Sequence, residues 1–199
     1  RGYFCQLAST KFTPLLETIT KVYCDESRNV GNHKYRLVGG VWILKDQGRN
    51  FVNDFDNKCR QLGRRDPVET IHFKNAPSRP DKPSMRYYEC LIDTFFEYVK
   101  SGKMFFRTVV VNQEYKFDHG FYNNGDPEVG FYKLYYYLII KRLTGDNRYH
   151  LRIADREVSK KAQAKDQKDR LLELRNSLNA GFRKEHGYPI VLMAMIKST

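Results

Sequence analysis

The fold is set by the stretch KVYCDESRNV, residues Lys21–Val30, together with the apolar run LVGGVWIL at Leu37–Leu44. The chain alternates weakly between apolar and polar residues from Leu15 and reaches the acidic pair Asp25-Glu26, which is typical of a strand with one buried face. The second run is almost continuously apolar, which indicates a strand inside a sheet. Its glycine pair predicts a bulge or a close approach of another backbone. The polar residues between the two runs favour a turn, so we expect a β-hairpin.

Beyond the hairpin, hydrophobic periodicity predicts an alternation of helices and strands. We expect helices over Asn50–Leu62, Ser84–Lys100, Pro127 to about Leu143 and Ser159–Glu185, and strands over Met104–Val111, Tyr149–Asp155 and Pro189–Ile196. The second helix should bury the face that carries Tyr88, Leu91, Ile92, Phe95, Phe96 and Val99, and the last helix the stripe Leu171, Leu174, Leu178 and Phe182. Early paired strands followed by helix–strand alternation predict a mixed α/β sheet with helices on both faces.

Length and charge limit the domain count and the partners. The chain has 199 residues, which predicts a single domain, expected over residues 15–199. Residues 1–14 show no clear period and are expected to form an N-terminal arm or a leftover linker. Its net charge of +12 favours a polyanionic partner, either nucleic acid or an anionic membrane surface. No apolar run approaches the roughly 20 residues of a membrane span, and no secretory pattern is present. The four cysteines form no C-x-x-C pair, so reduced thiols in a cytoplasmic protein are expected.

Acidic residues fall where predicted strands end. Asp25 and Glu26 close the first strand, and Asp155 closes the strand Tyr149–Asp155. Sites in open α/β sheets lie at the carboxyl ends of strands, so acids on distant strands can converge there. Carboxylates that converge repel each other unless a cation neutralises them, and hard oxygen ligands select Mg²⁺ or Mn²⁺. Such ions can activate water and stabilise a leaving oxygen, which predicts phosphodiester hydrolysis.

Four motifs in this order resemble the domain of unknown function 3800 family. They are DES after an apolar strand, a GGVWI-type strand, an E-x-I-H-F element at Glu69–Phe73 and an aspartate after a later strand. The resemblance spans Val22 to Ile196 and implies a ribonuclease-H-like fold with a metal-dependent nuclease site. It implies catalytic and metal-binding roles for Asp25, Glu69 and Asp155. It also suggests a role in mobile elements or phage defence.

The chain departs from that family pattern in two places. Arg28 stands where the family usually has glycine, and the family's closing aspartate belongs to a segment beyond Thr199. We expect either that the domain is C-terminally incomplete or that this site lacks one ligand. Glu26 is either a second metal ligand beside Asp25 or the partner of a nearby arginine, because adjacent strand residues face opposite sides. Two functions therefore stay open. One is a Mg²⁺- or Mn²⁺-dependent nuclease acting on DNA or RNA, and the other is an inactive module of the same fold that binds nucleic acid or a protein.

Basic residues near the proline-rich stretch 63–83 are the predicted contacts to a phosphate backbone. With Arg28 from the first loop, they are Arg28, Arg60, Arg64, Arg65, Lys74, Arg79 and Lys82. The basic residues of Lys160–Arg175 are interleaved with acids, which indicates a solvated helix face instead. The tyrosines near Phe131–Ile140 have helical spacing, which favours packing in the core or in a homo-oligomer over stacking on bases. A restriction-type E-x-K site at Glu114-Tyr115-Lys116 lacks a strand-borne aspartate at a suitable distance.

Overall fold

The computed structural model describes residues 18–27, 34–64, 76–79, 82–112, 127–144, 147–154, 161–187 and 192–197. The predicted arm over residues 1–14 lies outside these residues, as does the extended element that contains Glu69. None of the described helices is both long enough and apolar enough to cross a membrane.

The described strands form one mixed sheet in the order β3-β2-β1-β4-β5. They are β1 (Thr18–Ser27), β2 (Tyr35–Leu44), β3 (Met104–Asn112), β4 (Asn147–Ala154) and β5 (Leu192–Lys197). The hairpin prediction is confirmed, because β2 pairs antiparallel with β1 and then with β3. On the other side of β1, β4 pairs parallel with it, and β5 pairs parallel with β4. The most central strand is therefore the one that delivers Asp25.

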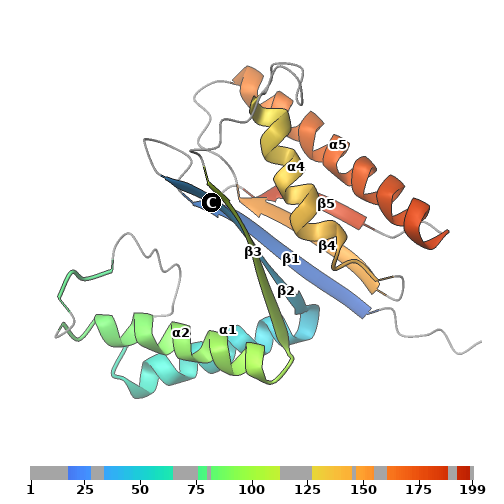
Figure 1. The fold of residues 1–199 in the computed structure, drawn as a ribbon. Coiled ribbons are helices and arrows are strands. Elements are labelled where there is room, and N and C mark those ends of the chain that lie inside the picture. The colour runs from blue at the N-terminus through green and yellow to red at the C-terminus, as the bar shows by residue number, and fades with distance from the viewer. Residues whose placement is uncertain are drawn as a thin grey trace, which may run out of the picture.

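Helices cover both faces of the sheet, as predicted (Figure 1). They are α1 (Lys45–Gln61), α2 (Met85–Lys100), α4 (Pro127–Ile140) and α5 (Lys161–His186). The helix expected from Asn50 begins at Lys45 instead, directly after β2. Its first turn is polar, so it carries no apolar periodicity that could have revealed it. Strand order, helices on both faces and the opening hairpin together make this a ribonuclease-H-like α/β fold.

The main core lies between the sheet and the pair α4–α5. From β1, Val22 and Cys24 point into it, and the predicted stripe of α5 is buried against it. The α5 residues are Leu171, Leu174, Leu178 and Phe182, none more than 6% exposed. The tyrosine-rich helix α4 packs here too, with Phe131 and Tyr135 in edge-to-face contact at 5.1 Å between ring centroids. Core packing, rather than base stacking, therefore accounts for Tyr135.

Gly40 allows α4 to approach β2 closely. A Cβ atom at this position would lie 2.9 Å from two ring carbons of Trp42 and 3.2 Å from a methyl group of Leu138. The pairing of β2 with β1 and β3 runs through both glycines without an extra residue. Of the two predictions for the glycine pair, the bulge is wrong, and the close neighbours of Gly40 are side chains rather than another backbone.

The opposite face is covered mainly over β2 and β3, by α1 and α2. A smaller cluster of Ile43, Tyr98 and Met104 forms the contact, with Phe51 edge-to-face on Tyr98 at 5.2 Å. The predicted buried face of α2 is partly wrong: Thr94 and Tyr98 are the buried residues of this helix, whereas Ile92 is 42% and Phe96 51% exposed. Among the described elements, α2 packs mainly against α1 and β3, and two residues of its apolar stripe, Ile92 and Phe96, stay exposed.

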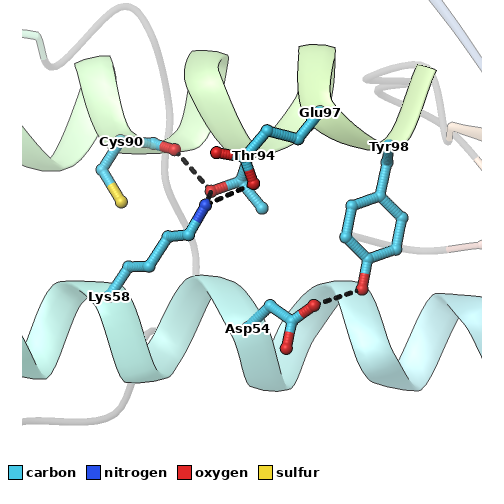
Figure 2. A network of polar contacts seen from close by, with 6 residues as sticks. All are labelled: Asp54, Lys58, Cys90, Thr94, Glu97 and Tyr98. Atoms are coloured by element: carbon cyan, nitrogen blue, oxygen red, sulfur yellow. Dashed lines mark hydrogen bonds and ion pairs between the residues drawn. The ribbon is translucent and has the colours of Figure 1, made fainter. Parts of the chain in front are cut away.

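Polar contacts join α1 to α2 (Figure 2). Lys58 of α1 donates to Glu97 Oε2 at 2.5 Å and to Thr94 Oγ1 at 3.3 Å. The Tyr98 hydroxyl donates back to Asp54 Oδ2 at 2.5 Å. Burial, then the hydrogen bond to this carboxylate, raise the pKa of Tyr98 to about 12, so the phenol remains a donor at neutral pH. These contacts hold the two helices as one unit.

Candidate functional site at the carboxyl end of β1

The carboxyl ends of β1 and β4 lie side by side. In their parallel register Cys24 is opposite Ile153, and both side chains are buried in the main core. The next residue of β1 is Asp25, and β4 ends at Ala154, one residue beyond the partner of Cys24. Residues of β1 and β4 that are about 130 positions apart in the sequence thus meet at one edge of the sheet.

Asp25 and Glu26 point to opposite faces of the sheet. Asp25 is exposed, and its Oδ1 accepts the backbone N–H of Glu26 at 2.7 Å. Glu26 is half-buried on the α4 face, where its Oε2 accepts the hydroxyl of Tyr135 at 3.2 Å. Glu26 therefore lies on the other face from Asp25, and its described side-chain contact is the hydroxyl of Tyr135. A pairing of Glu26 with arginine stays a prediction.

Tyr135 is a fixed donor in this contact. Its side chain is 1% exposed, and burial, followed by the negative charge of Glu26, raises its pKa above the ordinary range. The phenol therefore stays protonated at neutral pH and can donate to the carboxylate. The arrangement ties Glu26 to α4 and leaves Asp25 as the open carboxylate at this strand end.

Cys24 sits between the core and the two acids, but it is not a nucleophile. Burial raises the pKa of its thiol, and the charge of Asp25 raises it further. A thiol becomes reactive as the thiolate, which these surroundings disfavour.

Two of the four predicted metal ligands, Glu69 and Asp155, lie outside the described residues. Within the described ranges, no group of three or more histidine, cysteine, aspartate or glutamate side chains could hold a metal ion. Asp25 fits a hard cation, since it presents an exposed carboxylate at a strand end. Glu26 fits less well because it faces the hydroxyl of Tyr135.

The predicted loop contacts to nucleic acid are described only in part. Arg28, Arg65 and Lys74 lie outside the described residues. Arg60 is exposed but pairs with Asp56 at 2.8 Å, and the guanidinium of Arg64 lies over the Tyr87 ring, 5.4 Å from its centroid. Arg79 and Lys82 are exposed. Their role in binding stays a prediction.

A group of basic residues on the sheet was not among the predicted site residues. On the face of β1 and β4 that points away from α4 and α5, Lys21 is opposite His150, and Tyr23 is opposite Arg152. Lys45, the first residue of α1, lies close enough for its charge to act on His150. We call these five residues the basic sheet face. The signal was present in the alternation of KVYCD and RYHLR, where the basic residues occupy the positions opposite the core side.

A concavity between α1 and α2 is separate from these residues. It has a volume of about 510 Å³ and lies beside the polar contacts of Figure 2. Its lining includes the basic residues Lys58 and Arg86 and the acids Glu89, Asp93 and Glu97. The mixed charges largely compensate one another, so the concavity shows no preference for an anionic or a cationic ligand.

Comparisons with known proteins give structural neighbours only. No protein-family model matches the chain, and no curated protein matches it either. A chain of the complex of PCNA with ribonuclease HII from Archaeoglobus fulgidus is similar over 89% of this chain and 63% of its own, with 12% identity and a TM-score of 0.45. Ribonuclease H2 from Pyrococcus horikoshii shows the same two coverages, 10% identity and a TM-score of 0.48. The chain thus spans less than two thirds of the length of both.

Proposed function

We propose that this chain is a metal-dependent phosphodiester hydrolase that acts on nucleic acid through carboxylates at the carboxyl ends of β1 and β4. The observation that supports this most is the parallel pairing of the two strands, with Cys24 opposite Ile153. It brings the strand end that carries Asp25 next to Ala154, the residue before Asp155 in the sequence. The net charge of +12 is suited to a polyanionic substrate.

In this proposal Asp25, Glu69 and Asp155 hold Mg²⁺ or Mn²⁺. A bound ion would supply a Lewis acid and a water molecule of lowered pKa for attack on phosphorus. Asp25 contributes an exposed carboxylate, and the bond from the Glu26 amide to its Oδ1 limits how that carboxylate can turn. The membership of the domain of unknown function 3800 family, inferred from the sequence motifs, belongs to this same proposal.

The test is cleavage of single-stranded DNA, duplex DNA, RNA and an RNA–DNA hybrid in Mg²⁺ or Mn²⁺, with a chelator as the blank. Asp25→Asn and Asp155→Asn should each lower the rate by more than the roughly 100-fold typical of losing an outer-shell partner of a metal. Asp169→Asn, on the exposed surface of α5, is the matched control and should leave the rate unchanged. Calorimetric titration with Mn²⁺ should show weaker binding in Asp25→Asn. Cleavage that persists in both site variants would refute the assignment.

One observation favours a second candidate, a non-catalytic module that binds nucleic acid. Glu26 faces Tyr135 rather than Asp25, so the adjacent acids do not form a pair on one face. The two candidates predict opposite responses to a chelator. For the module, nucleic-acid binding should be salt-dependent and indifferent to EDTA, with no cleavage in any divalent ion.

A further inference from the structure

We propose that the basic sheet face, formed by Lys21, Tyr23, Lys45, His150 and Arg152, binds the phosphate backbone of a nucleic acid and guides it toward Asp25. The inference rests on the proposed function, because it assigns the surface that holds the substrate of that site. Its residues differ from the basic residues predicted near the proline-rich stretch.

The positions of these residues follow from the strand register. Lys21 and Tyr23 alternate with the buried Val22 and Cys24, so they share the face that points away from the main core. Asp25 is the next residue of β1 on that face. From Lys21 to Asp25 the strand advances about 13 Å, at roughly 3.3 Å per residue. A chain that lies along the cations therefore reaches the candidate catalytic carboxylate at the end of the same row.

The described helices leave this part of the sheet open. On this side α1 and α2 pack against β2 and β3, and α1 also contacts β1 (Figure 1). The ring of Tyr23 is 37% exposed, and Lys45 is exposed at the start of α1. An apolar partner helix does not suit a surface of this composition, because covering it would desolvate several cations without compensation.

The positive charges of Lys21, Lys45 and Arg152 all act on His150. Burial lowers the pKa of His150, and the charges of Lys45, Arg152 and Lys21 lower it further. The Arg152 guanidinium lies over the Tyr23 ring, 5.7 Å from its centroid, and its buried Nε has no hydrogen-bond partner among the described residues. Cations that share one face of a sheet are well compensated by a polyanion, and several of them together fit the repeated charge of a nucleic-acid backbone.

The experiment measures binding alone, in EDTA, so that no metal-dependent step contributes. A fluorescently labelled 20-nucleotide single strand and the matching duplex are titrated with the protein at several salt concentrations. The face variant is Lys21→Gln/Lys45→Gln/Arg152→Gln. Its control, Lys168→Gln/Arg183→Gln/Lys184→Gln, removes the same charge from exposed positions on α5. A second pair, Lys21→Glu/Lys45→Glu against Lys168→Glu/Lys184→Glu, keeps the contact of Arg152 with Tyr23.

Three lost phosphate contacts should reduce the slope of log K against log salt by about 2–3, since each contributes about 0.7–0.9. If the face variant and the unchanged protein bind equally at 1 M salt, this smaller slope corresponds to roughly 100-fold weaker binding of the variant at 0.1 M salt. The α5 control should change the slope by less than the amount of one contact. Equal losses in the face variant and its control, in both pairs, would overturn the inference.

The outcomes also separate this inference from the proposed function. If binding depends on the face but no divalent ion supports cleavage, the hydrolase proposal fails and the binding surface stands. If Asp25-dependent cleavage is found while the face variant binds as its control does, only the binding surface fails.

Discussion

Replacing Tyr135 by phenylalanine removes one hydroxyl group from the core and leaves the ring in place. That hydroxyl donates to Glu26 Oε2 at 3.2 Å from a side chain that is 1% exposed. A hydrogen bond to a charged group contributes about 1.5–3 kcal/mol. This bond is longer than the usual O–H···O range and Glu26 is half-buried, so we expect the free energy of unfolding to fall by about 1–2 kcal/mol. For a chain of this size, the melting temperature should fall by about 2–8 °C.

Urea unfolding followed by circular dichroism measures this change. The matched control is Tyr137→Phe on the same helix, where the side chain is 61% exposed and the change should stay within about 0.5 kcal/mol. A double-mutant cycle with Glu26→Gln should give a coupling of about 1 kcal/mol. If Tyr135→Phe destabilises no more than Tyr137→Phe, or the cycle shows no coupling, then the hydroxyl does not fix Glu26 to α4.

Three further changes test the packing, the pH response and the α1–α2 contacts. Gly40→Val should lower the free energy of unfolding by about 1–3 kcal/mol, because the new side chain overlaps Leu138 and Trp42; unchanged stability would mean that α4 can move away freely. The pKa of Tyr98 is raised to about 12, so the folded state keeps the phenol proton to higher pH than the unfolded chain does. The contribution of Tyr98 to the free energy of unfolding is therefore complete below about pH 10 and is lost as pH rises toward 12. Tyr98→Phe should accordingly flatten the fall in stability between pH 10 and 12, and an identical slope in both proteins would contradict the assignment. Lys58→Met should lower the free energy of unfolding by no more than about 1 kcal/mol in thermal unfolding, because the ion pair of Lys58 with Glu97 is largely exposed. A much larger loss of stability would show that this ion pair contributes more to the α1–α2 contact than its exposure suggests.

Periodicity located most of the elements but not all of their ends or faces. The stripe of α5 that ends in Phe182 is buried as predicted, because apolar residues at helical spacing lie on one side of the helix and that side packs against the main core. The start of α1 at Lys45 was missed, since its first turn is polar and is fixed by the end of β2 rather than by burial. On α2, Phe96 was expected to be buried and is 51% exposed. Which part of an apolar stripe is covered depends on the neighbouring helix, and the local sequence does not contain that information.

In the candidate site, too, some features follow from the local sequence and others depend on contacts with distant parts of the chain. Asp25 could be singled out because a carboxylate at the end of an apolar strand is visible in ten residues of sequence. The orientation of Glu26 toward Tyr135 could not be assigned, because it depends on where α4 crosses the sheet. The roles proposed for Glu69 and Asp155 remain predictions, as both residues lie outside the described part of the chain.

By itself, the sequence determined the hairpin, the strand that carries Asp25, the buried stripe of α5 and a strongly basic chain. These properties arise from backbone preference and side-chain alternation over a few residues, and they do not depend on distant contacts. Only the tertiary structure decided that β4 lies parallel to β1, which brings Lys21 opposite His150 and Tyr23 opposite Arg152. The physical reason is that strand pairing joins segments more than a hundred residues apart through backbone hydrogen bonds, which are the same for every residue type. The basic sheet face therefore exists only in the folded chain.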